Sequence, residues 1–369
     1  MARYPGKVAL QQRVLPRYRV AFIEALAEAC PGGLIVFAGQ PLPVEGIEAA
    51  VGLQTARLTQ VQNVCFRDPS SKLFLCWQSG FVDWLEKNQP AVLIVEANPR
   101  NLATHMAVRW MHQRGRPVVG WGLGAPPIAG PLAFLRRWER LSLLRSLDAV
   151  IAYSRRGAEQ YRSLGFPAER VFVAPNAVAP RPANPPTERP LISAAPLTIL
   201  FIGRLQERKR VDHLLHACAS LPLEKQPRLL IVGDGPAREP LQALAGEIYP
   251  QAEFLGARHG PDLEPAFAAA DLFVLPGTGG LAVQQAMAHA LPVIVARGDG
   301  TQDDLVRPEN GWQIPPDDQG ALKEALSLAL SDPARLRRMG QEAYRLVADE
   351  VNLEAMVQVF VEALWAASR

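Results

Sequence analysis

Two basic side chains follow a short apolar segment in the second half of the chain. Residues 197–202, Leu-Thr-Ile-Leu-Phe-Ile, read as a buried β-strand, and Arg204 and Lys209 lie just beyond its end. Ligands of open α/β sheets bind at the carboxyl ends of the strands, so we expect both cations to face that edge. Two cations placed there can neutralise the charge of a leaving diphosphate.

A glycine-rich turn follows a second apolar segment. Gly277, Gly279 and Gly280 lie between the strand pattern that begins at Asp271 and a helical stretch, which predicts a strand, a turn and a helix. Glycines let a backbone approach a diphosphate, and the following helix presents unpaired N–H groups. Such a turn either binds phosphate or is a tight turn without a ligand, and the glycines alone leave both interpretations open.

Polar or aromatic residues also end the predicted strands of the first half. They are Glu96, Trp121, Ser154 and Asn176. We take them as candidates for the acceptor side, because strand ends of a parallel sheet share one edge. Glu96 is a candidate for acceptor binding or proton transfer, and capping a turn is the alternative role for a lone glutamate.

The sequence predicts no metal site. His213 and His216 are three residues apart on a predicted helix but have no third ligand, so we interpret them as surface or packing residues. Asp299, Asp303 and Asp304 could bind a divalent cation, but we favour Asp303 and Asp304 as caps of the next helix. The four cysteines fit no metal or disulfide spacing, which indicates a reducing cytoplasm.

Parallel sheets with helices on their faces are needed to position these residues. Apolar strand patterns alternate with helical stretches along the chain, which is typical of an α/β fold with doubly wound parallel sheets. A chain of 369 residues that are 49% apolar is long enough for two cores. Residues 181–197 are proline-rich and read as a linker. We therefore expect one domain over 1–180 and a second over 198–350.

Charge is distributed unevenly between the two halves. Residues 1–190 contain 23 Lys and Arg against 13 Asp and Glu, whereas residues 191–369 contain 16 against 23. The basic half could face anionic lipid or a phosphorylated small molecule, or its arginines could be scattered and merely solubilising. Basic runs interleaved with aromatic residues and recognition helices are missing, so we expect no nucleic acid partner.

Residues 134–145 form a basic amphipathic helical pattern. This helix could rest on anionic lipid, but a helix packed on the sheet with its arginines in water has the same pattern, and we favour the second interpretation. The amino terminus lacks the apolar core of a signal peptide, and no run reaches membrane-spanning length. We expect a cytoplasmic protein that is soluble or peripheral at the inner membrane face.

Seven motifs follow one another in the second half. They are Phe-Ile-Gly-Arg-Leu-Gln-Glu-Arg-Lys at 201–209, Leu-Ile-Val-Gly-Asp-Gly-Pro at 230–236, Phe-Leu-Gly at 254–256, Ala-Ala-Ala-Asp-Leu-Phe-Val-Leu-Pro at 268–276, Ala-Met-Ala at 286–288, Pro-Val-Ile at 292–294 and Asn-Gly at 310–311. In order and spacing this half resembles family four of the retaining glycosyltransferases. The first half is similar more loosely, through residues 148–154, 165–167 and 173–178.

The resemblance implies a GT-B architecture, with two Rossmann-like domains facing across a cleft. The nucleotide sugar would bind the second domain and the acceptor the first, with residues 351–369 forming a helix that crosses back to the first. Arg204 and Lys209 look like the family's diphosphate-binding pair. The resemblance places these residues on the donor: Gly203, Gly233, Gly235, Leu255, Gly277, Thr278, Gly279, Gly280, Leu281 and Gln285.

Three positions depart from the family pattern. The family usually has two glutamates before Ala-Met-Ala, where this chain has Gly277 and Gln285, and a histidine in the first domain near Leu123. The first glutamate normally touches the donor sugar and the second the ribose. Gln285 can still hydrogen-bond a ribose hydroxyl, but Gly277 offers only its backbone.

The resemblance implies metal-independent, retaining transfer of a hexosyl unit to a glycan, a lipid-linked or a small-molecule acceptor, without a cofactor besides the nucleotide sugar. The leaving phosphate is thought to help deprotonate the acceptor in this family. One alternative is a GT-B protein that has lost its chemistry and serves as a nucleotide-binding or partner subunit of a polysaccharide assembly system. A sugar-nucleotide epimerase and a purely structural protein are weaker alternatives.

Overall fold

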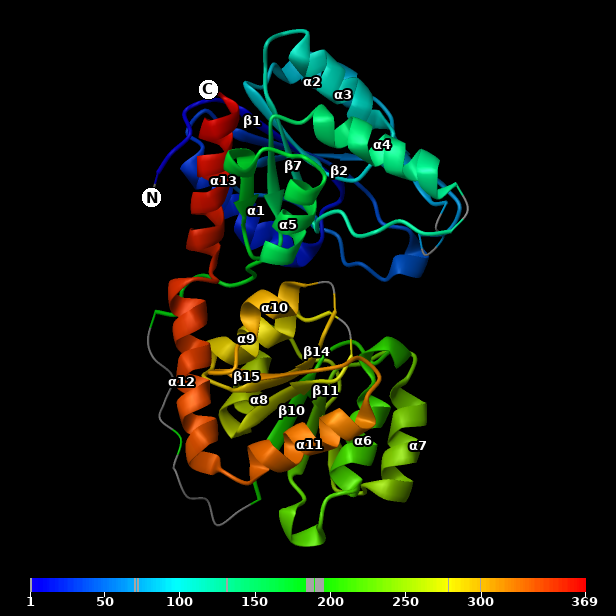
Figure 1. The fold of residues 1–369 in the computed structure, drawn as a ribbon, viewed down its shortest axis with the longest axis vertical. Helices are drawn as coiled ribbons and strands as arrows, with labels where there is room; N and C mark the ends of the chain where they lie inside the picture. Colours follow the sequence, from blue (N-terminus) through cyan, green and yellow to red (C-terminus); the bar gives the residue numbers. More distant parts are fainter. Residues whose placement is uncertain are drawn as a thin grey trace. The chain divides into compact units, whose positions relative to one another are not determined.

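The computed structural model of the chain describes residues 2–69, 71, 73–130, 132–183, 189, 196–277, 279–298 and 300–369. It contains two compact units. The N-unit comprises Met1–Val178 and Leu353–Arg369, and the C-unit comprises Ala179–Asn352 (Figure 1). Most of the predicted linker at 181–197 lies outside the described residues.

The N-unit is built on a seven-stranded parallel sheet with the order β3-β2-β1-β6-β7-β8-β9. Its strands are β1 (Val8–Val14), β2 (Leu34–Gly39), β3 (Arg57–Val61), β6 (Val92–Glu96), β7 (Val118–Gly122), β8 (Ala149–Ala152) and β9 (Val171–Val173). Alternate residues of β1 enter different cores, with Leu10 on one face and Ala9 on the other. This period of two is expected of a strand buried on both faces.

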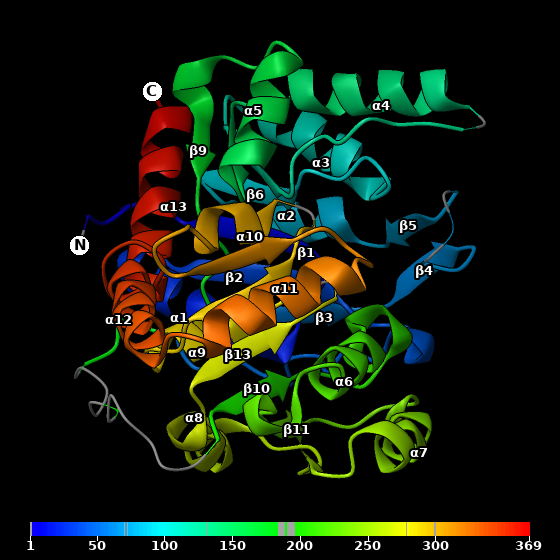
Figure 2. The ribbon, with the colours of Figure 1, turned by 60° about the horizontal axis from the view of Figure 1, so that its bottom comes forward.

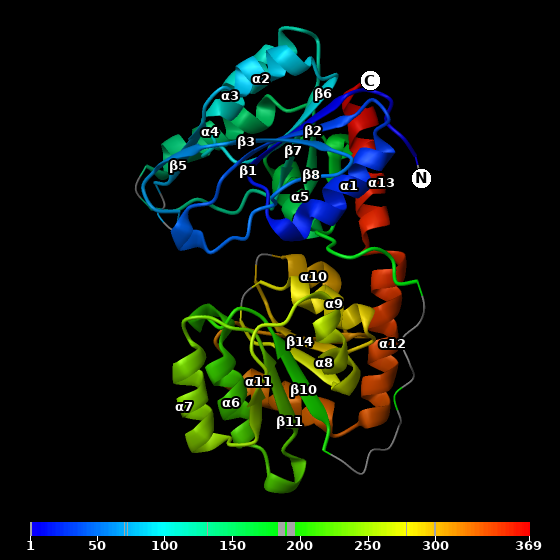
Figure 3. The same cartoon turned by 180° about the vertical axis from the view of Figure 1, so that it is seen from behind.

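Helices cover both faces of the N-unit sheet. They are α1 (Val20–Ala29), α2 (Phe81–Asn88), α3 (Ala103–His112), α4 (Ala133–Arg145), α5 (Arg155–Ser163) and α13 (Leu353–Ala367). One core joins α1 to α13, which lie side by side in Figure 3, and the Phe22 and Phe360 rings are 4.7 Å apart. The other core joins α2, α3 and α5. The last helix of the chain is therefore part of the N-unit.

A separate antiparallel pair, β4 (Asn63–Phe66) and β5 (Leu75–Gln78), adds to the N-unit. Cys65 and Cys76 face each other across it, with their sulfur atoms 3.9 Å apart. Both thiols are free. The linear spacing of the cysteines did not predict this proximity, because only the hairpin pairing creates it.

The C-unit has a six-stranded parallel sheet with the order β12-β11-β10-β13-β14-β15. Its strands are β10 (Thr198–Ile202), β11 (Arg228–Val232), β12 (Ala252–Phe254), β13 (Leu272–Leu275), β14 (Val293–Ala296) and β15 (Gly311–Ile314). Its helices are α6 (Val211–Ala219), α7 (Arg238–Ile248), α8 (Glu264–Ala269), α9 (Leu281–Ala288), α10 (Thr301–Leu305), α11 (Gln319–Leu330) and α12 (Pro333–Asp349) (Figure 2). The predicted α/β class with doubly wound parallel sheets is confirmed.

Short 3-10 helices complete both units. They are η1 (Arg17–Arg19), η2 (Pro43–Glu45), η3 (Ala168–Arg170), η4 (Glu207–Lys209), η5 (Leu223–Lys225) and η6 (Gly260–Leu263). In each sheet the strand order reverses at one point, between β1 and β6 in the N-unit and between β10 and β13 in the C-unit. Ligands of open α/β sheets bind at such switch points, beyond the carboxyl ends of the strands.

Candidate functional site

At the switch point of the C-unit, the loop after β10 lies directly against the loop after β13. A Cβ atom added to Gly277 would lie 2.2 Å from the carbonyl oxygen of Arg208 and 2.5 Å from the Cα of Lys209. Carbon atoms that are not bonded prefer separations of about 3.5–4.0 Å. The approach of the two loops therefore requires glycine at position 277.

Lys209 is brought against the glycine turn. Its side chain is buried, with 8% of the residue exposed, and its Nζ lies 3.2 Å from the position that a Cβ would take at Gly279. Burial, and then the nearby positive charge of Arg208, lower the pKa of Lys209 to about 8. A cation held in this way is stabilised by any anion that reaches the turn.

The other basic residues of this loop are arranged differently. Arg204 is exposed beyond β10. The Nη1 of Arg208 lies 3.5 Å from the Cβ position of Gly279, and its Nε donates to Oε1 of Gln206 at 3.0 Å. Sequence reasoning did not select Arg208, although the Arg-Lys-Arg run at 208–210 could have marked it. The Nε of Arg210 instead lies 2.8 Å from the Asp317 carboxylate.

Gly233 and Gly235 allow two neighbouring loops to touch. Their φ angles are +143° and +151°, and added Cβ atoms would lie 1.9 Å from the carbonyl oxygen of Gly203 and 2.4 Å from that of Leu205. The loops after β10 and β11 are therefore in backbone contact. Leu255 is half-buried after β12, and its N–H donates to a carbonyl of β11 at 2.9 Å. Gly233, Gly235 and Leu255, which the resemblance places on the donor, thus each have a structural role of their own.

The turn runs from Gly279 and Gly280 directly into α9. Gly280 has a φ of 169°, an extended conformation open to any residue, but a Cβ there would lie 2.8 Å from a methyl group of Val283. Leu281 is half-buried at the first position of the helix. Helix amino termini present N–H groups and the positive end of the helix dipole, so this geometry suits an anion. Thr278 lies outside the described residues.

The two glutamines of α9 have different environments. Gln285, the predicted ribose partner, is half-buried. Gln284 is fully buried, and its Nε2 donates to the backbone carbonyl of Val351 at 2.6 Å. Gln284 therefore holds the segment between α12 and α13 against α9, and the half-buried Gln285 stays the predicted ribose partner.

The candidate metal ligands do not assemble. His213 is buried and contacts Arg210. Asp303 and Asp304 lie in the first turn of α10, whose N-cap is Gly300, so neither occupies the N-cap position. Asp299 lies outside the described residues. Across the described part of the chain, no group of three or more His, Cys, Asp or Glu side chains could hold a metal ion.

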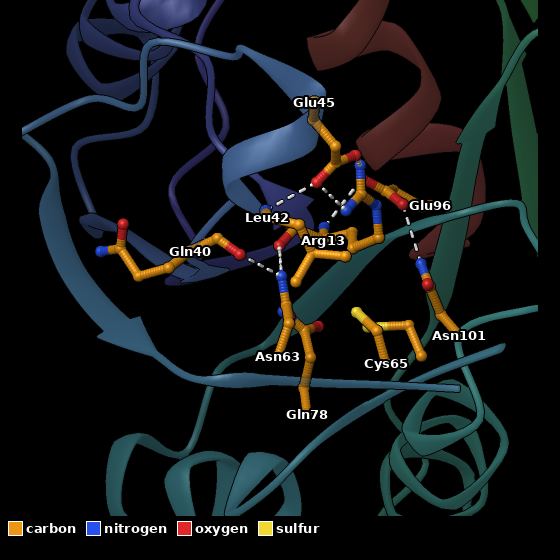
Figure 4. Close-up of polar contacts among 10 residues, drawn as sticks. Arg13, Gln40, Leu42, Glu45, Asn63, Cys65, Gln78, Glu96 and Asn101 are labelled. Carbon is orange, nitrogen blue, oxygen red and sulfur yellow. Dashed lines mark hydrogen bonds and ion pairs between the residues drawn. The ribbon is translucent and has the colours of Figure 1, made fainter. Parts of the chain in front are cut away.

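Glu96, the last residue of β6, joins the end of β1 to the loop after β6 at the switch point of the N-unit (Figure 4). Its Oε1 accepts from the backbone N–H of Arg13 at 2.8 Å, and its Oε2 accepts from Nδ2 of Asn101 at 2.8 Å. Arg13 also forms a part-buried ion pair with Glu45 at 2.6 Å. Both carboxylate oxygens of Glu96 are thus engaged, which favours the turn-capping alternative over proton transfer.

Trp121 is a core residue with 1% of its surface exposed. Its ring packs against Phe360 at 5.0 Å, and the guanidinium of Arg19 lies 4.3 Å from its centre. Arg19 also donates to the hydroxyl of Tyr153 at 2.8 Å. Trp121 therefore offers no open face for stacking on a ligand, although it lines the cavity described below.

Ser154 and Asn176 are the remaining acceptor-side candidates. Ser154 is fully buried and caps α5, because its Oγ accepts from the N–H of Gly157 at 3.0 Å. This contact uses the hydroxyl for the helix start, so the prediction that Ser154 faces an acceptor is wrong. Asn176 is half-buried in the segment after β9.

A cavity of about 930 Å³ opens at the carboxyl edge of the N-unit sheet. Residues following β6, β7 and β8 line it, together with α4 and the β4–β5 pair. Its basic residues are Arg19, Arg67, Arg100, Arg136 and Arg140, and its acidic residues are Glu96 and Glu139. Leu123, at the place of the family's histidine, also lines it. Glu96 and Trp121, which were expected from the sequence at this sheet edge, are both in its lining, but the sequence did not predict its arginines, which are far apart along the chain.

The sequence favours α4 as a helix packed on the sheet, but in the described chain only the end of α4 is buried in this way. Leu143 and Leu144, near its end, are its buried residues among those described, whereas Phe134 and Trp138 are 71% and 70% exposed. The apolar side chains of its first half therefore lie in solvent. No helix of the described chain is long and apolar enough to span a membrane.

Two family models match the chain. Residues 13–177 match "Glycosyl transferase 4-like domain" and residues 188–346 match "Glycosyl transferases group 1". Among characterised proteins, the chain is 24% identical over 309 residues to the lipopolysaccharide core biosynthesis glycosyltransferase LpsE of Rhizobium meliloti, covering 76% of this chain and 87% of that protein. It is 40% identical over 118 residues to a GDP-mannose-dependent alpha-mannosyltransferase of Mycobacterium tuberculosis, which is 31% of this chain and 29% of that protein.

Solved structures share the fold over nearly the whole chain. Sucrose-phosphate synthase from Thermosynechococcus elongatus superposes with a TM-score of 0.71 at 21% identity, covering 96% of this chain and 97% of that one. HepE from Anabaena in complex with UDP gives a TM-score of 0.72 at 17% identity, covering 98% and 99%. At these low sequence identities, the structural similarity shows a shared fold alone.

Proposed function

Since the chain belongs to the group 1 glycosyl transferases, with a 4-like first domain and the GT-B fold, we propose that this glycosyltransferase moves a hexosyl unit from a nucleotide-diphosphate sugar to its acceptor with retention. The acceptor would be a glycan, a lipid-linked or a small molecule. The observation that carries the proposal is the position of the buried Lys209 against the glycine turn that precedes α9.

The chemistry explains why such a site would be needed. Breaking the anomeric bond leaves an oxocarbenium-like sugar and a diphosphate whose negative charge increases. Charges and N–H groups that are already in place stabilise that state more than the ground state. Lys209, Arg204 and the backbone of Gly279 to Leu281 would supply them. Arg208 joins this set because of its distance to Gly279.

The names of similar proteins support a nucleotide sugar as the donor. HepE was crystallised with UDP and with UDP-glucose, and the mycobacterial relative is named as dependent on GDP-mannose. These ligands belong to those proteins. For this chain they favour a donor with a diphosphate, and they leave the base and the sugar to be found by binding measurements.

We further propose that transfer needs neither a metal nor another cofactor. Lys209, Arg204 and Arg208 belong to the one loop that follows β10 and would provide the charge that a divalent cation would otherwise contribute. Adding EDTA should leave turnover unchanged if the cationic side chains alone neutralise the diphosphate. A dependence on Mg²⁺ or Mn²⁺ that survives desalting would contradict this part of the proposal.

A second candidate function is a nucleotide-binding or partner subunit without transferase chemistry. Gly277 favours it, because the backbone of Arg208 and Lys209 fills the space that the first side-chain atom of a glutamate would need there. The family's usual contact to the donor sugar is therefore missing for a steric reason. A chain that binds the nucleotide sugar but neither transfers nor hydrolyses its sugar would support this candidate.

We also propose peripheral contact with an anionic membrane, at the cytoplasmic face, through α4. Its exposed Phe134, Leu135 and Trp138 could enter the interface while its arginines meet lipid phosphates. The exposed apolar side chains carry this proposal, since clustered apolar residues in solvent are typical of an interaction surface and basic residues lie among them.

Turnover with a panel of donors tests the proposed function. Melting temperatures with UDP-, GDP- and ADP-sugars would identify the donor, because a ligand that binds only the native state raises the melting temperature. Transfer should then fall when Lys209 is replaced by methionine, which keeps the length of the side chain. Lys323→Met on the exposed surface of α11 is the matched control. Equal turnover by Lys209→Met and Lys323→Met would contradict the assigned role.

A further inference from the structure

The cavity of the N-unit gathers guanidinium groups without matching carboxylates. Its acidic residues are Glu96 and Glu139, and both oxygens of Glu96 already accept hydrogen bonds from Arg13 and Asn101. Within the described part of the chain, Arg19, Arg100 and Arg140 form no ion pair with a carboxylate. Arginines in partly buried sites are usually paired, so this cavity has an excess of positive charge.

Neighbouring arginines repel one another at the α4 side of the cavity. Burial lowers the pKa of Arg140, Tyr161 opposes this effect, and the positive charges of Arg100 and Arg136 lower the pKa further by smaller amounts. The Nη1 of Arg140 donates to the backbone oxygen of Pro126, which fixes the side chain without neutralising it. Like charges held at one site are relieved when an anion binds between them.

Two residues that line the same cavity have buried N–H groups without a partner in the described chain. Among the described residues, neither the Nε of Arg19 nor the Nε1 of Trp121 has a hydrogen-bond partner. Arg19 is otherwise fixed, because its terminal nitrogens donate to Gln12 and Tyr153 and its guanidinium lies over the Trp121 ring. Buried donors are nearly always satisfied in folded proteins, so two unsatisfied donors in one wall mark it as a place that favours an acceptor atom.

We propose that this cavity binds the acceptor through an anionic group, a phosphate or a carboxylate, held by Arg19, Arg100 and Arg140. The inference rests on the proposed glycosyl transfer and names the chemical class of its acceptor. Guanidinium groups match the geometry of phosphate and carboxylate oxygens with paired hydrogen bonds. A volume of about 930 Å³ also leaves room for a sugar or a short acyl segment beside the anion.

The anionic group belongs either to a lipid-linked acceptor or to a free one, and probes can separate the two. We would titrate the full chain with glycerol 3-phosphate, with dihexanoylphosphatidylglycerol below its micelle concentration, and with glycerol as the neutral match. Tighter binding of the lipid indicates a lipid-linked acceptor, and equal binding of both anions indicates that the anionic group suffices. Either result supports the inference, whereas anions that bind no better than glycerol overturn it.

Variants locate the anion. Arg100→Gln and Arg140→Gln should each weaken the binding of the anionic probe by about tenfold, the effect of losing one charge-assisted hydrogen bond. Arg137→Gln is the matched control, because Arg137 is exposed on the same helix and does not line the cavity. If Arg140→Gln disturbs the loop at Pro126 because its hydrogen bond there is lost, the affinity of Arg100→Gln alone tests the inference. Affinities of both variants equal to that of Arg137→Gln would overturn the inference.

The same titrations separate this inference from the proposed function. Anion binding that is lost only in Lys209→Met belongs to the C-unit, which overturns the inference and leaves the transferase proposal intact. Anion binding that needs Arg100, in a chain that neither binds nor turns over any nucleotide sugar, keeps the cavity as an anion site and removes the proposed transfer.

Discussion

In the C-unit the loops at the switch point meet through glycines, whereas in the N-unit side chains join the loops at the corresponding point. Gly277 allows the backbones of the loops after β10 and β13 to touch, and Lys209 is buried against them. In the N-unit the carboxylate of Glu96 connects the end of β1, at Arg13, to Asn101 in the loop after β6. A wide cavity with several arginines opens beside it.

The difference shows how one architecture serves two kinds of ligand. Contact between backbones leaves little room for variation, which suits a group that is the same in every nucleotide sugar, the diphosphate. A cavity lined by side chains can change its shape and charge by substitution while the sheet stays the same. The C-unit would thus provide the groups that bind the diphosphate, and the N-unit would determine which acceptor is used.

The largest effect is expected from the loss of the buried cation in the C-unit. Lys209→Met should lower kcat/KM by about two to three orders of magnitude, by analogy with the removal of an oxyanion donor. Steady-state kinetics with the identified donor measure it. If Arg100→Gln in the N-unit lowered kcat more than Lys209→Met does, the division of roles between the units would be wrong.

The next effect concerns the glycine contact itself. Gly277→Ala should destabilise the chain by about 1–3 kcal/mol, because the added methyl group overlaps the backbone of Arg208 and Lys209. Donor affinity should fall with it. Gly246→Ala in α7 is the control, since a Cβ there meets no atom within 4 Å, and it should stabilise the chain by about 0.5–1 kcal/mol. Urea unfolding measures both, and equal midpoints would contradict the contact.

The pKa of about 8 at Lys209 predicts opposite trends for binding and stability. Donor affinity should weaken as the pH rises through 8, because the free protein loses the cation. Stability without ligand should instead rise between about pH 8 and pH 10.5, since the unfolded chain then binds the proton that the folded chain has lost. Calorimetry at several pH values tests this, and the trend in affinity should be absent in Lys209→Arg, whose side chain stays charged.

The smallest effect is expected at α4. Trp138→Ser should reduce cosedimentation with phosphatidylglycerol vesicles several-fold and change stability by less than about 0.5 kcal/mol, because the ring is 70% exposed. Leu223→Ser is the control in the C-unit, where Leu223 is 87% exposed. A similar loss of vesicle binding in both variants would show that exposed apolar area, rather than α4, drives the contact.

The sequence could predict much of the C-unit site because its parts are local. Arg204 and Lys209 follow a strand, and Gly277 to Gly280 precede a helix, so strand order alone brings them to one edge. It could not show that Gly277 is required by the backbone of Arg208, since that contact joins segments about seventy residues apart along the printed sequence.

The arginines of the N-unit cavity could not be predicted in the same way, although Glu96 and Trp121 were expected at that sheet edge. Arg19, Arg100 and Arg140 belong to three distant segments, and each is unremarkable in a basic half of the chain. Ser154 was misassigned because a serine at a strand end is also a helix start, and only the bond to Gly157 distinguishes the two. The exposed face of α4 was misjudged because periodicity does not say which side of a helix is covered.

The central claim is that the buried lysine and the glycine turn of the C-unit bind the donor's diphosphate. Calorimetric titration of the full chain with UDP, GDP and ADP tests it most directly, comparing the parent with Lys209→Met and Lys323→Met. We predict that at least one nucleotide binds the parent and Lys323→Met alike and binds Lys209→Met at least about tenfold more weakly. Equal affinity in all three proteins, or no binding of any nucleotide, would contradict the account.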